Sequence, residues 1–362
     1  MRYFSLFLFL FISFSFYSRA EENEPSTLTE IKTVDIKGTF YATPVYTSSN
    51  NIVIASHNKH IYFLKSNGEL VKSFKTDGWV HATPNVLKDS IVGIGSYDGN
   101  FYFFDENGNY QHHIKPGGII FTEPVEMGDH IAFGSTRGRI TFYDPESGEI
   151  SHTKGRRMMH GSPMVTSDTT LVIGANSKRL YFVNQEQEIT HTYKTKGWIM
   201  HSKPYETLDG NILIGSYDKN LHAIDKEGNL LWKFKTKGRI HGSPIQTKDS
   251  TIIIGSFDKH IYVLSPRGEL IKKIKTDKRV VSSPYAINDS VVVIGSYDKN
   301  LYFIDNFGNL INTYDTQGKI FSSPIALPCG TVYCCTTKGK MSFLPPAVVS
   351  ELLSNSKTNK EE

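Results

Sequence analysis

The feature that most constrains this 362-residue chain is a proline that returns about every forty residues. It occurs at Pro44, Pro84, Pro124, Pro163, Pro204, Pro244, Pro284 and Pro324. A fixed period of this length is typical of a protein that repeats one supersecondary unit. Such a unit cannot bury its apolar faces alone, so neighbouring units must stack against each other.

One unit, residues 240–276, reads as four short strands. Its β-branched and aromatic runs are 240–247, 251–256, 261–264 and 270–275, and the segments between them carry turn residues. Four antiparallel strands in about forty residues are typical of a propeller blade. We therefore predict an all-β, eight-bladed β-propeller of four-stranded antiparallel blades.

The prolines and the chain ends agree with this fold. A proline cannot donate to a sheet ladder, so within a sheet it belongs on an edge strand, such as the innermost strand of a blade. The last unit, 320–344, supplies only three strands, while residues 28–37 resemble the fourth strands of other units. We predict that this N-terminal strand completes the last blade and closes the ring, which removes exposed sheet edges.

The sequence divides into four segments. Residues 1–20 hold Arg2, an apolar run and a small-residue site ending at Ala20, which predicts a secretory signal peptide. An uncleaved membrane anchor is the alternative, although the apolar run is short for a span. Residues 21–27 form a short linker, 28–345 the propeller and 346–362 a frayed polar tail. We expect an exported protein, periplasmic or secreted, without stable membrane insertion after cleavage.

Charge and cysteine content narrow the function further. The net charge of +4 is small and the two signs are interspersed, so we expect no nucleic-acid partner. The three cysteines are Cys329, Cys334 and Cys335, too few for a disulfide framework. Adjacent strand residues point to opposite faces, and Cys334 and Cys335 align with Ile294 and Gly295 of the previous unit. This register favours a packing role for the pair.

Two segments carry a family resemblance: IGSYDGNFYFFDENG at 94–108 and IGSYDKNLYFIDNFG at 294–308. Here the chain resembles the PQQ-like propeller superfamily, which includes eight-bladed quinoprotein dehydrogenases and BamB-type scaffolds of outer-membrane assembly. The resemblance covers nearly the whole chain after residue 20. It implies either a partner-binding propeller or an oxidoreductase that uses PQQ with a divalent metal.

The departures from the dehydrogenase pattern decide between these classes. Those enzymes typically end each repeat with an Asp, a Thr-Gly turn and a docking tryptophan, to which Asp225, Gly228 and Trp232 come closest here, with a turn shortened by one residue. They are also longer, with insertions that build the active site. We therefore expect a non-catalytic, monomeric scaffold that binds another protein and holds no cofactor. The alternatives are a small PQQ-dependent oxidoreductase and a propeller that binds a carbohydrate or another small ligand.

Two positions beside each proline vary between units and are candidates for a site. Three residues before it stand Tyr41, His81, Phe121, His160, His201, His241, Val281 and Phe321. One residue before it stand Thr43, Thr83, Glu123, Ser162, Lys203, Ser243, Ser283 and Ser323. Strand residues two apart share a face, so both sets belong to one surface near the axis.

The departures at these positions predict a contact site for a ligand or partner at the channel mouth. Its candidate residues are His81, Glu123, His160, His201, Lys203 and His241. Converging imidazoles can bind a metal or an anion. However, we expect the first strands to diverge around a wide axis, which favours packing or simple pore lining. Glu123 and Lys203 replace Ser or Thr, so we expect them to face solvent or to pair with each other.

A third repeated position holds aspartates in the predicted second hairpin turn: Asp98, Asp218, Asp258 and Asp298. Their spacing lacks the alternating oxygen ligands of a calcium loop. An aspartate in such a turn usually caps the backbone, and we predict that role here. The chain also contains no nucleophile elbow, phosphate loop or zinc-protease motif.

Overall fold

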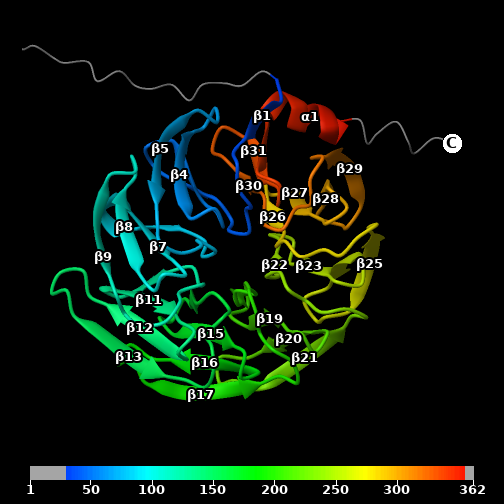
Figure 1. The fold of residues 1–362 in the computed structure, drawn as a ribbon. Helices are drawn as coiled ribbons and strands as arrows, with labels where there is room; N and C mark the ends of the chain where they lie inside the picture. The colour runs from blue at the N-terminus through cyan, green and yellow to red at the C-terminus, as the bar shows by residue number, and fades with distance from the viewer. Residues whose placement is uncertain (1–29, 355–362) are drawn as a thin grey trace, which may run out of the picture.

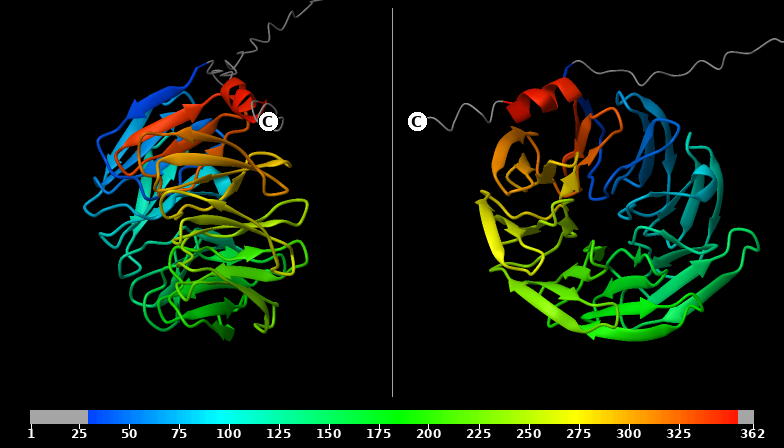
Figure 2. Two further views of the ribbon diagram at one scale, coloured as in Figure 1. Left: turned by 90° about the vertical axis from the view of Figure 1, so that its right-hand side faces the viewer. Right: turned by 180° about the vertical axis from the view of Figure 1, so that it is seen from behind.

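The forty-residue units fold into eight four-stranded antiparallel sheets arranged in a ring (Figure 1). The computed structural model describes residues 30–354 of the chain. Seen from the side and from behind, the sheets stand around one axis as the blades of a disc (Figure 2). The predicted all-β, eight-bladed propeller is confirmed.

In blades 1 to 7 the strands follow the chain from the axis to the rim, with blade 1 formed by the order β2-β3-β4-β5. The innermost strands are β2 (Val45–Tyr46), β6 (Asn85–Leu87), β10 (Val125–Met127), β14 (Met164–Val165), β18 (Tyr205–Glu206), β22 (Ile245–Gln246), β26 (Tyr285–Ala286) and β30 (Ile325–Ala326). The second strands are β3 (Asn51–Ala55), β7 (Ile91–Gly95), β11 (His130–Gly134), β15 (Leu171–Ala175), β19 (Ile212–Gly215), β23 (Ile252–Ser256), β27 (Val291–Gly295) and β31 (Val332–Cys335).

The outer half of each blade carries the third and fourth strands. The third strands are β4 (His60–Lys65), β8 (Phe101–Asp105), β12 (Arg139–Tyr143), β16 (Arg179–Val183), β20 (Asn220–Ile224), β24 (His260–Leu264), β28 (Asn300–Asp305) and β32 (Lys340–Leu344). The outermost strands are β5 (Leu70–Lys75), β9 (Tyr110–Ile114), β13 (Ile150–Lys154), β17 (Ile189–Lys194), β21 (Leu230–Lys235), β25 (Leu270–Lys275), β29 (Leu310–Asp315) and β1 (Lys32–Asp35).

The ring closes through β1, which is first in the chain and outermost in blade 8. It pairs antiparallel with β32, with Lys32 opposite Phe343 and Asp35 opposite Lys340. This confirms the predicted closure by the N-terminal strand. Because the ends of the folded ring share one sheet, blade 8 cannot form without both.

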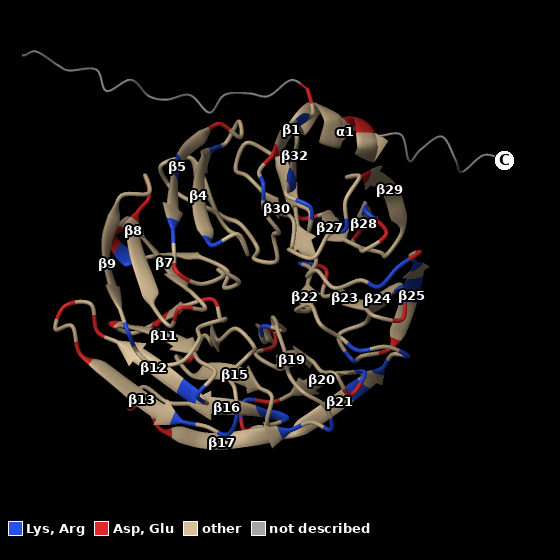
Figure 3. Ribbon diagram, in the orientation of Figure 1, with Lys and Arg blue, Asp and Glu red and all other residues tan. Residues whose placement is uncertain are grey.

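The apolar cores lie between neighbouring blades. Between blades 1 and 2, Val53 and Phe63 pack against Ile94 and Phe104, with the two phenylalanine rings 5.5 Å apart. Second and third strands are buried on both faces, whereas the rim strands are largely exposed. Acidic and basic residues are interspersed around the ring (Figure 3). Stability therefore depends on each blade having two neighbours.

The innermost strands are shorter than the sequence predicts. The predicted strand 240–247 is reduced to Ile245 and Gln246 in β22, which begins directly after Pro244. The residues before the proline leave the sheet and turn towards the axis. The predicted outer strand 270–275 matches β25.

The segment after the last blade differs from the predicted frayed tail. Residues Pro346–Ser354 form the helix α1, which packs against β29. Val349 is buried, and the Asn312 amide donates to the Leu352 carbonyl oxygen at 3.0 Å. The apolar residues of this short helix find a partner on the rim, so packing makes it stable.

The four repeated aspartates cap turns, as predicted. One oxygen of Asp298 accepts hydrogen bonds from the Asp277 amide at 3.0 Å and the Tyr302 hydroxyl at 2.8 Å. Its other oxygen accepts from the Asn300 amide at 3.0 Å. Each carboxylate thus ties its hairpin to the connection through which the chain enters that same blade.

The predicted signal peptide, the linker and residues 355–362 of the tail lie outside the described residues. Within residues 30–354, no helix is long and apolar enough to cross a membrane.

Candidate functional site

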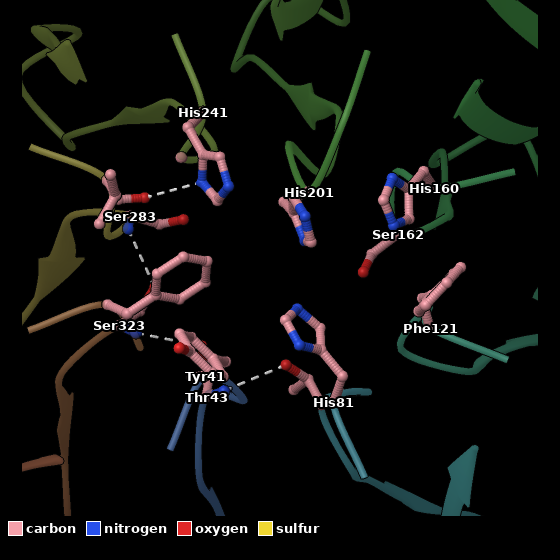
Figure 4. Close-up of a pocket in the computed structure, with 14 residues that line it drawn as sticks. Tyr41, Thr43, His81, Phe121, His160, Ser162, His201, His241, Ser283 and Ser323 are labelled. Atoms are coloured by element: carbon pink, nitrogen blue, oxygen red, sulfur yellow. Dashed lines mark hydrogen bonds between the residues drawn. The ribbon is translucent and has the colours of Figure 1, made fainter. Parts of the chain in front are cut away.

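The residues three positions before the prolines meet at the axis, where they form what we call the axial belt (Figure 4). The imidazoles of His160, His201 and His241 follow one another at centroid distances of 4.7 and 4.5 Å. His81 of the blade 2 entry contacts His201 at 5.2 Å, and Phe321 contacts His241 at 5.1 Å. Side chains from opposite sides of the ring therefore touch across the axis.

This convergence corrects the expectation that the first strands diverge too far for the histidines to meet. The side chains reach the axis because the residues before each proline have left the sheet. The histidine rings stack or tilt against one another, with 21° between His201 and His241. Stacked rings do not aim their nitrogens at one point, and within residues 30–354 no group of three His, Cys, Asp or Glu residues is placed to hold a metal ion.

Burial lowers the pKa of every belt histidine. The pKa of His81 falls to about 3, with repulsion from His57, His160 and His241 adding to the desolvation. The pKa values of His160 and His241 fall to about 4, and that of His201 lies well below its ordinary value. The belt is therefore a cluster of neutral imidazoles at physiological pH, which can stack without charge repulsion.

A second layer lies one step along the axis, at the positions directly before the prolines. Here a backbone amide donates to the hydroxyl of the next blade, and we call this the hydroxyl ring. Its bonds run from Lys203 to Ser243, Ser243 to Ser283, Ser283 to Ser323, Ser323 to Thr43, Thr43 to Thr83 and Glu123 to Ser162, at 2.8–3.2 Å. The bond from Ser323 to Thr43 joins the last blade to the first, so the hydroxyl ring also stabilises the closed propeller near the axis.

Glu123 and Lys203 stand at the two positions of this ring that have no hydroxyl. Their side chains pair with each other, with Lys203 Nζ 2.8 Å from Glu123 Oε1. The ion pair spans from blade 3 to blade 5, across Ser162 of blade 4. Of the two alternatives drawn from the sequence, pairing is the one observed.

The hydroxyl ring opens into a wider hollow, the funnel, of about 580 Å³. Its wall is formed by the prolines, the innermost strands and the Glu123–Lys203 pair. The axial belt closes its floor and leaves a cavity of only about 70 Å³ at the axis. All six candidate residues thus lie at the axis, the histidines in the belt and the ion pair at the funnel.

Sequence analysis overlooked a second cluster, on the side of the belt away from the funnel. Three of its residues are His57, Trp79 and Tyr97, from the second hairpin turn and the connection between blades. His57 Nε2 lies 2.8 Å from His81 Nδ1, and its ring stacks on Trp79 at 5.2 Å and 11°. His57 departs from the Tyr or Phe that four other units hold there, which was the available signal.

The same ring of positions holds cations on the opposite side of the axis. Arg279 lies 4.3 Å from the centroid of Tyr297 and 5.1 Å from that of Phe257, and Arg239 lies 5.0 Å from that of Tyr217. These distances are typical of cation–π contacts. We call this whole surface, from His57 and Trp79 round to Arg239 and Arg279, the aromatic–arginine face.

The adjacent cysteines lie apart from these surfaces. Cys334 is buried between blades 7 and 8, and Cys335 between blades 8 and 1. They therefore point to opposite faces of β31, as predicted, and pack as core residues. Burial raises the pKa of the Cys334 thiol to about 12, which keeps it protonated.

Known proteins share this architecture. BamB from Moraxella catarrhalis matches with a TM-score of 0.72 and 14% identity, over 87% of this chain and 98% of that chain. The computationally designed protein Ika8 matches with a TM-score of 0.70 and 16% identity, over 86% of this chain and 97% of that chain. At these identities the structures establish the fold alone, and no curated protein matches the chain.

Two family models match the sequence itself. One is described as the beta-propeller domain of lambda-carrageenase and matches residues 207–290. The other is described as outer membrane protein assembly factor BamB and matches residues 24–219, more than half of the chain. This chain therefore belongs to the family of BamB-type, PQQ-like propellers.

Proposed function

We propose that this chain is a non-catalytic, extracytoplasmic scaffold that binds another protein through the axial faces of its propeller. The observation that carries the proposal is the closed axis, because side chains from opposite blades meet in the axial belt and leave about 70 Å³. Pockets for cofactors and drug-sized ligands measure roughly 300–1,000 Å³. With the axis filled, the broad faces around it are the surfaces that the fold offers to a partner.

The funnel is large enough for a ligand, but its charges do not suit a quinone cofactor. PQQ is planar and anionic and calls for a pocket that encloses it, with free cations beside an aromatic floor. Lys203 is the single Lys or Arg among the described residues that line the funnel, and it is already paired with Glu123. Cys334 and Cys335 are buried and do not line the funnel, so they could not contact a cofactor bound there.

Two sequence properties support work outside the cytoplasm. Residues 1–20 have the pattern of a secretory signal, and the matched family is described by a role in outer membrane protein assembly. We infer that the chain, after removal of residues 1–20, acts in the periplasm or outside the cell. A scaffold that only holds a partner protein requires no catalytic group there.

The proposal is tested by photo-cross-linking in the cells that naturally express the chain. Benzoylphenylalanine replaces Trp79 on the aromatic–arginine face, Leu208 beside the funnel or Ile271 on the rim, which are 51%, 68% and 53% exposed. We expect one discrete protein adduct from an axial face and a much lower yield from Ile271. Equal yields from all three positions would contradict the proposal.

The rival oxidoreductase has its own test. The purified chain is titrated with PQQ and calcium while thermal melting and dye-linked oxidation of alcohols and sugars are followed. We expect no saturable change in melting temperature and no oxidation. A stoichiometric rise in melting temperature together with turnover would establish the quinoprotein alternative.

A further inference from the structure

The aromatic–arginine face carries cations that the protein itself does not neutralise. On three successive connections between blades stand Arg239, Arg279 and Lys319, and all three are exposed. Each is held over an aromatic ring, Lys319 at 5.9 Å from the centroid of Tyr297. Within residues 30–354, none of the three lies within 4.0 Å of a carboxylate oxygen.

The nearby turn carboxylates do not pair with the arginines, because their hydrogen-bonded oxygens accept from other donors and Asp258 Oδ1 is buried 3.4 Å from His260 Nδ1. Asp258 Oδ2 accepts from the Lys237 amide at 2.7 Å, the Gly238 amide at 3.2 Å and the Tyr262 hydroxyl at 2.9 Å. Asp298 is committed in the same way in the next blade. Arg279 also hydrogen-bonds the Tyr297 side chain, and the remaining donors of the two guanidinium groups are available for an incoming anion.

The aromatic rings fix these cations in place. Arg279 lies between Phe257 of blade 6 and Tyr297 of blade 7, so one guanidinium spans two blades. Arg239 lies over Tyr217 of blade 5. A planar guanidinium held against a ring loses less conformational freedom on binding and presents its fork to a carboxylate.

The composition of the face points to a protein partner. Two exposed tryptophans lie on this face, Trp198 on the connection next to that of Arg239 and Trp79 across the axis, at 46% and 51% exposure. Trp, Tyr and Arg are the residues that most often dominate the binding energy of protein interfaces. A surface that combines unpaired arginines with exposed tryptophans suits a partner segment that supplies carboxylates between apolar side chains.

We propose that the aromatic–arginine face binds an acidic segment, rich in Asp or Glu, of the partner protein. This inference rests on the proposed scaffold function and specifies the chemistry of its partner. Carboxylates of the segment pair with Arg239 and Arg279, while Trp198 on the neighbouring connection covers its apolar residues. The funnel on the opposite side remains free for a different contact.

The test measures binding of a fluorescent peptide of alternating Glu and Tyr residues, with a Gln-for-Glu peptide as the neutral comparison. The double variant Arg239→Gln/Arg279→Gln removes two cations from the face. Its matched control, Lys233→Gln/Lys273→Gln, removes two exposed cations from the rim strands of blades 5 and 6. Equal melting temperatures of both variants and the native chain verify the fold.

We expect the acidic peptide to bind the native chain and the rim variant alike, and the arginine variant about tenfold more weakly or worse, as for the loss of charge-assisted hydrogen bonds. Equal weakening in both variants, or no preference over the neutral peptide, would overturn the inference. Binding of lambda-carrageenan but not of the acidic peptide would assign the face to an anionic polysaccharide instead. Those failures leave the scaffold proposal standing if the cross-linker at Leu208 still captures its protein.

Discussion

Lys203 and Glu123, eighty residues apart in the chain, form an ion pair of 2.8 Å on the wall of the funnel. The pair occupies the two positions at which the hydroxyl ring has no hydroxyl to offer. The side chains are 33% and 19% exposed, so each charge relies on the other for part of its solvation. At a position where the other six units hold Ser or Thr, these two units thus hold residues of opposite charge that pair with each other.

This pairing predicts an asymmetric response to mutation. The single variants Glu123→Ser and Lys203→Ser each leave a partly buried charge alone, at a cost of about 1–2 kcal/mol in the free energy of unfolding. The double variant restores hydroxyls to the ring and should be less destabilised than the sum of the singles. Urea denaturation of all four proteins gives the coupling energy, for which we expect about 1 kcal/mol. A coupling near zero would mean that the pair contributes nothing to the fold.

The neutral belt predicts acid sensitivity. Burial lowers the pKa of His241 in the folded chain to about 4, from an ordinary 6.5, in surroundings that include His160, His201 and Arg279. Between these pH values the unfolded chain binds the proton and the folded chain does not, so stability falls as the pH drops from 6.5 towards 4. For one such histidine the loss is roughly 3 kcal/mol.

The check is the slope of unfolding free energy against pH in this window. The slope is proportional to the number of protons taken up on unfolding, and His241→Gln should lower that number by close to one relative to the native chain. The variant His113→Gln, on the exposed strand β9, serves as the control. An unchanged slope in His241→Gln would show that the belt histidine is already protonated in the folded state.

The capped turns predict a local stability effect. Asp298→Ala removes the acceptor for the Asp277 and Asn300 amides and the Tyr302 hydroxyl, and should cost about 1–3 kcal/mol. Asp209→Ala, at an exposed loop position, should cost close to nothing. Thermal melting distinguishes the two, and equal effects would refute the capping role.

The helix α1 predicts that the segment after the last blade stabilises the ring. Deleting residues 346–362 uncovers the packing surface that β29 shares with Val349 and removes the acceptor of the Asn312 amide. We expect the melting temperature to fall by several degrees while the circular dichroism of the sheets persists. No change on deletion would mean that the helix contributes nothing to the closed ring.

The propeller fold could be predicted from the sequence because the features that indicate it each lie within a few neighbouring residues of the chain. Pro244, the turn residues around Asp258 and the β-branched run in 270–275 each depend on neighbours in the chain, and together they predicted blade 6 and the ring. Closure through 28–37 followed from counting strands. The helix α1 was missed because its stability comes from β29, a contact that its own short sequence does not encode.

The site was predicted only in part, for a related reason. His81, Glu123 and Lys203 differ from the residues at the same positions of other units, and these differences identified the region near the axis as a candidate site. Whether His81 reaches His201 depends on the radius of the ring, which no single repeat encodes. The aromatic–arginine face was missed because Arg279, Phe257 and Tyr297 belong to different units and meet only when the blades assemble.

The most direct test of the central claim is the mass of the particle in which the chain occurs. A C-terminally tagged chain is isolated under native conditions from cells that express it naturally. The mass of the isolated particle is then measured by mass photometry. The scaffold account predicts a particle of defined stoichiometry that contains one other protein and is heavier than the chain alone, whose mass is 40.8 kDa before residues 1–20 are removed. A particle no heavier than the chain alone, with PQQ-dependent oxidation in the same fraction, would contradict it.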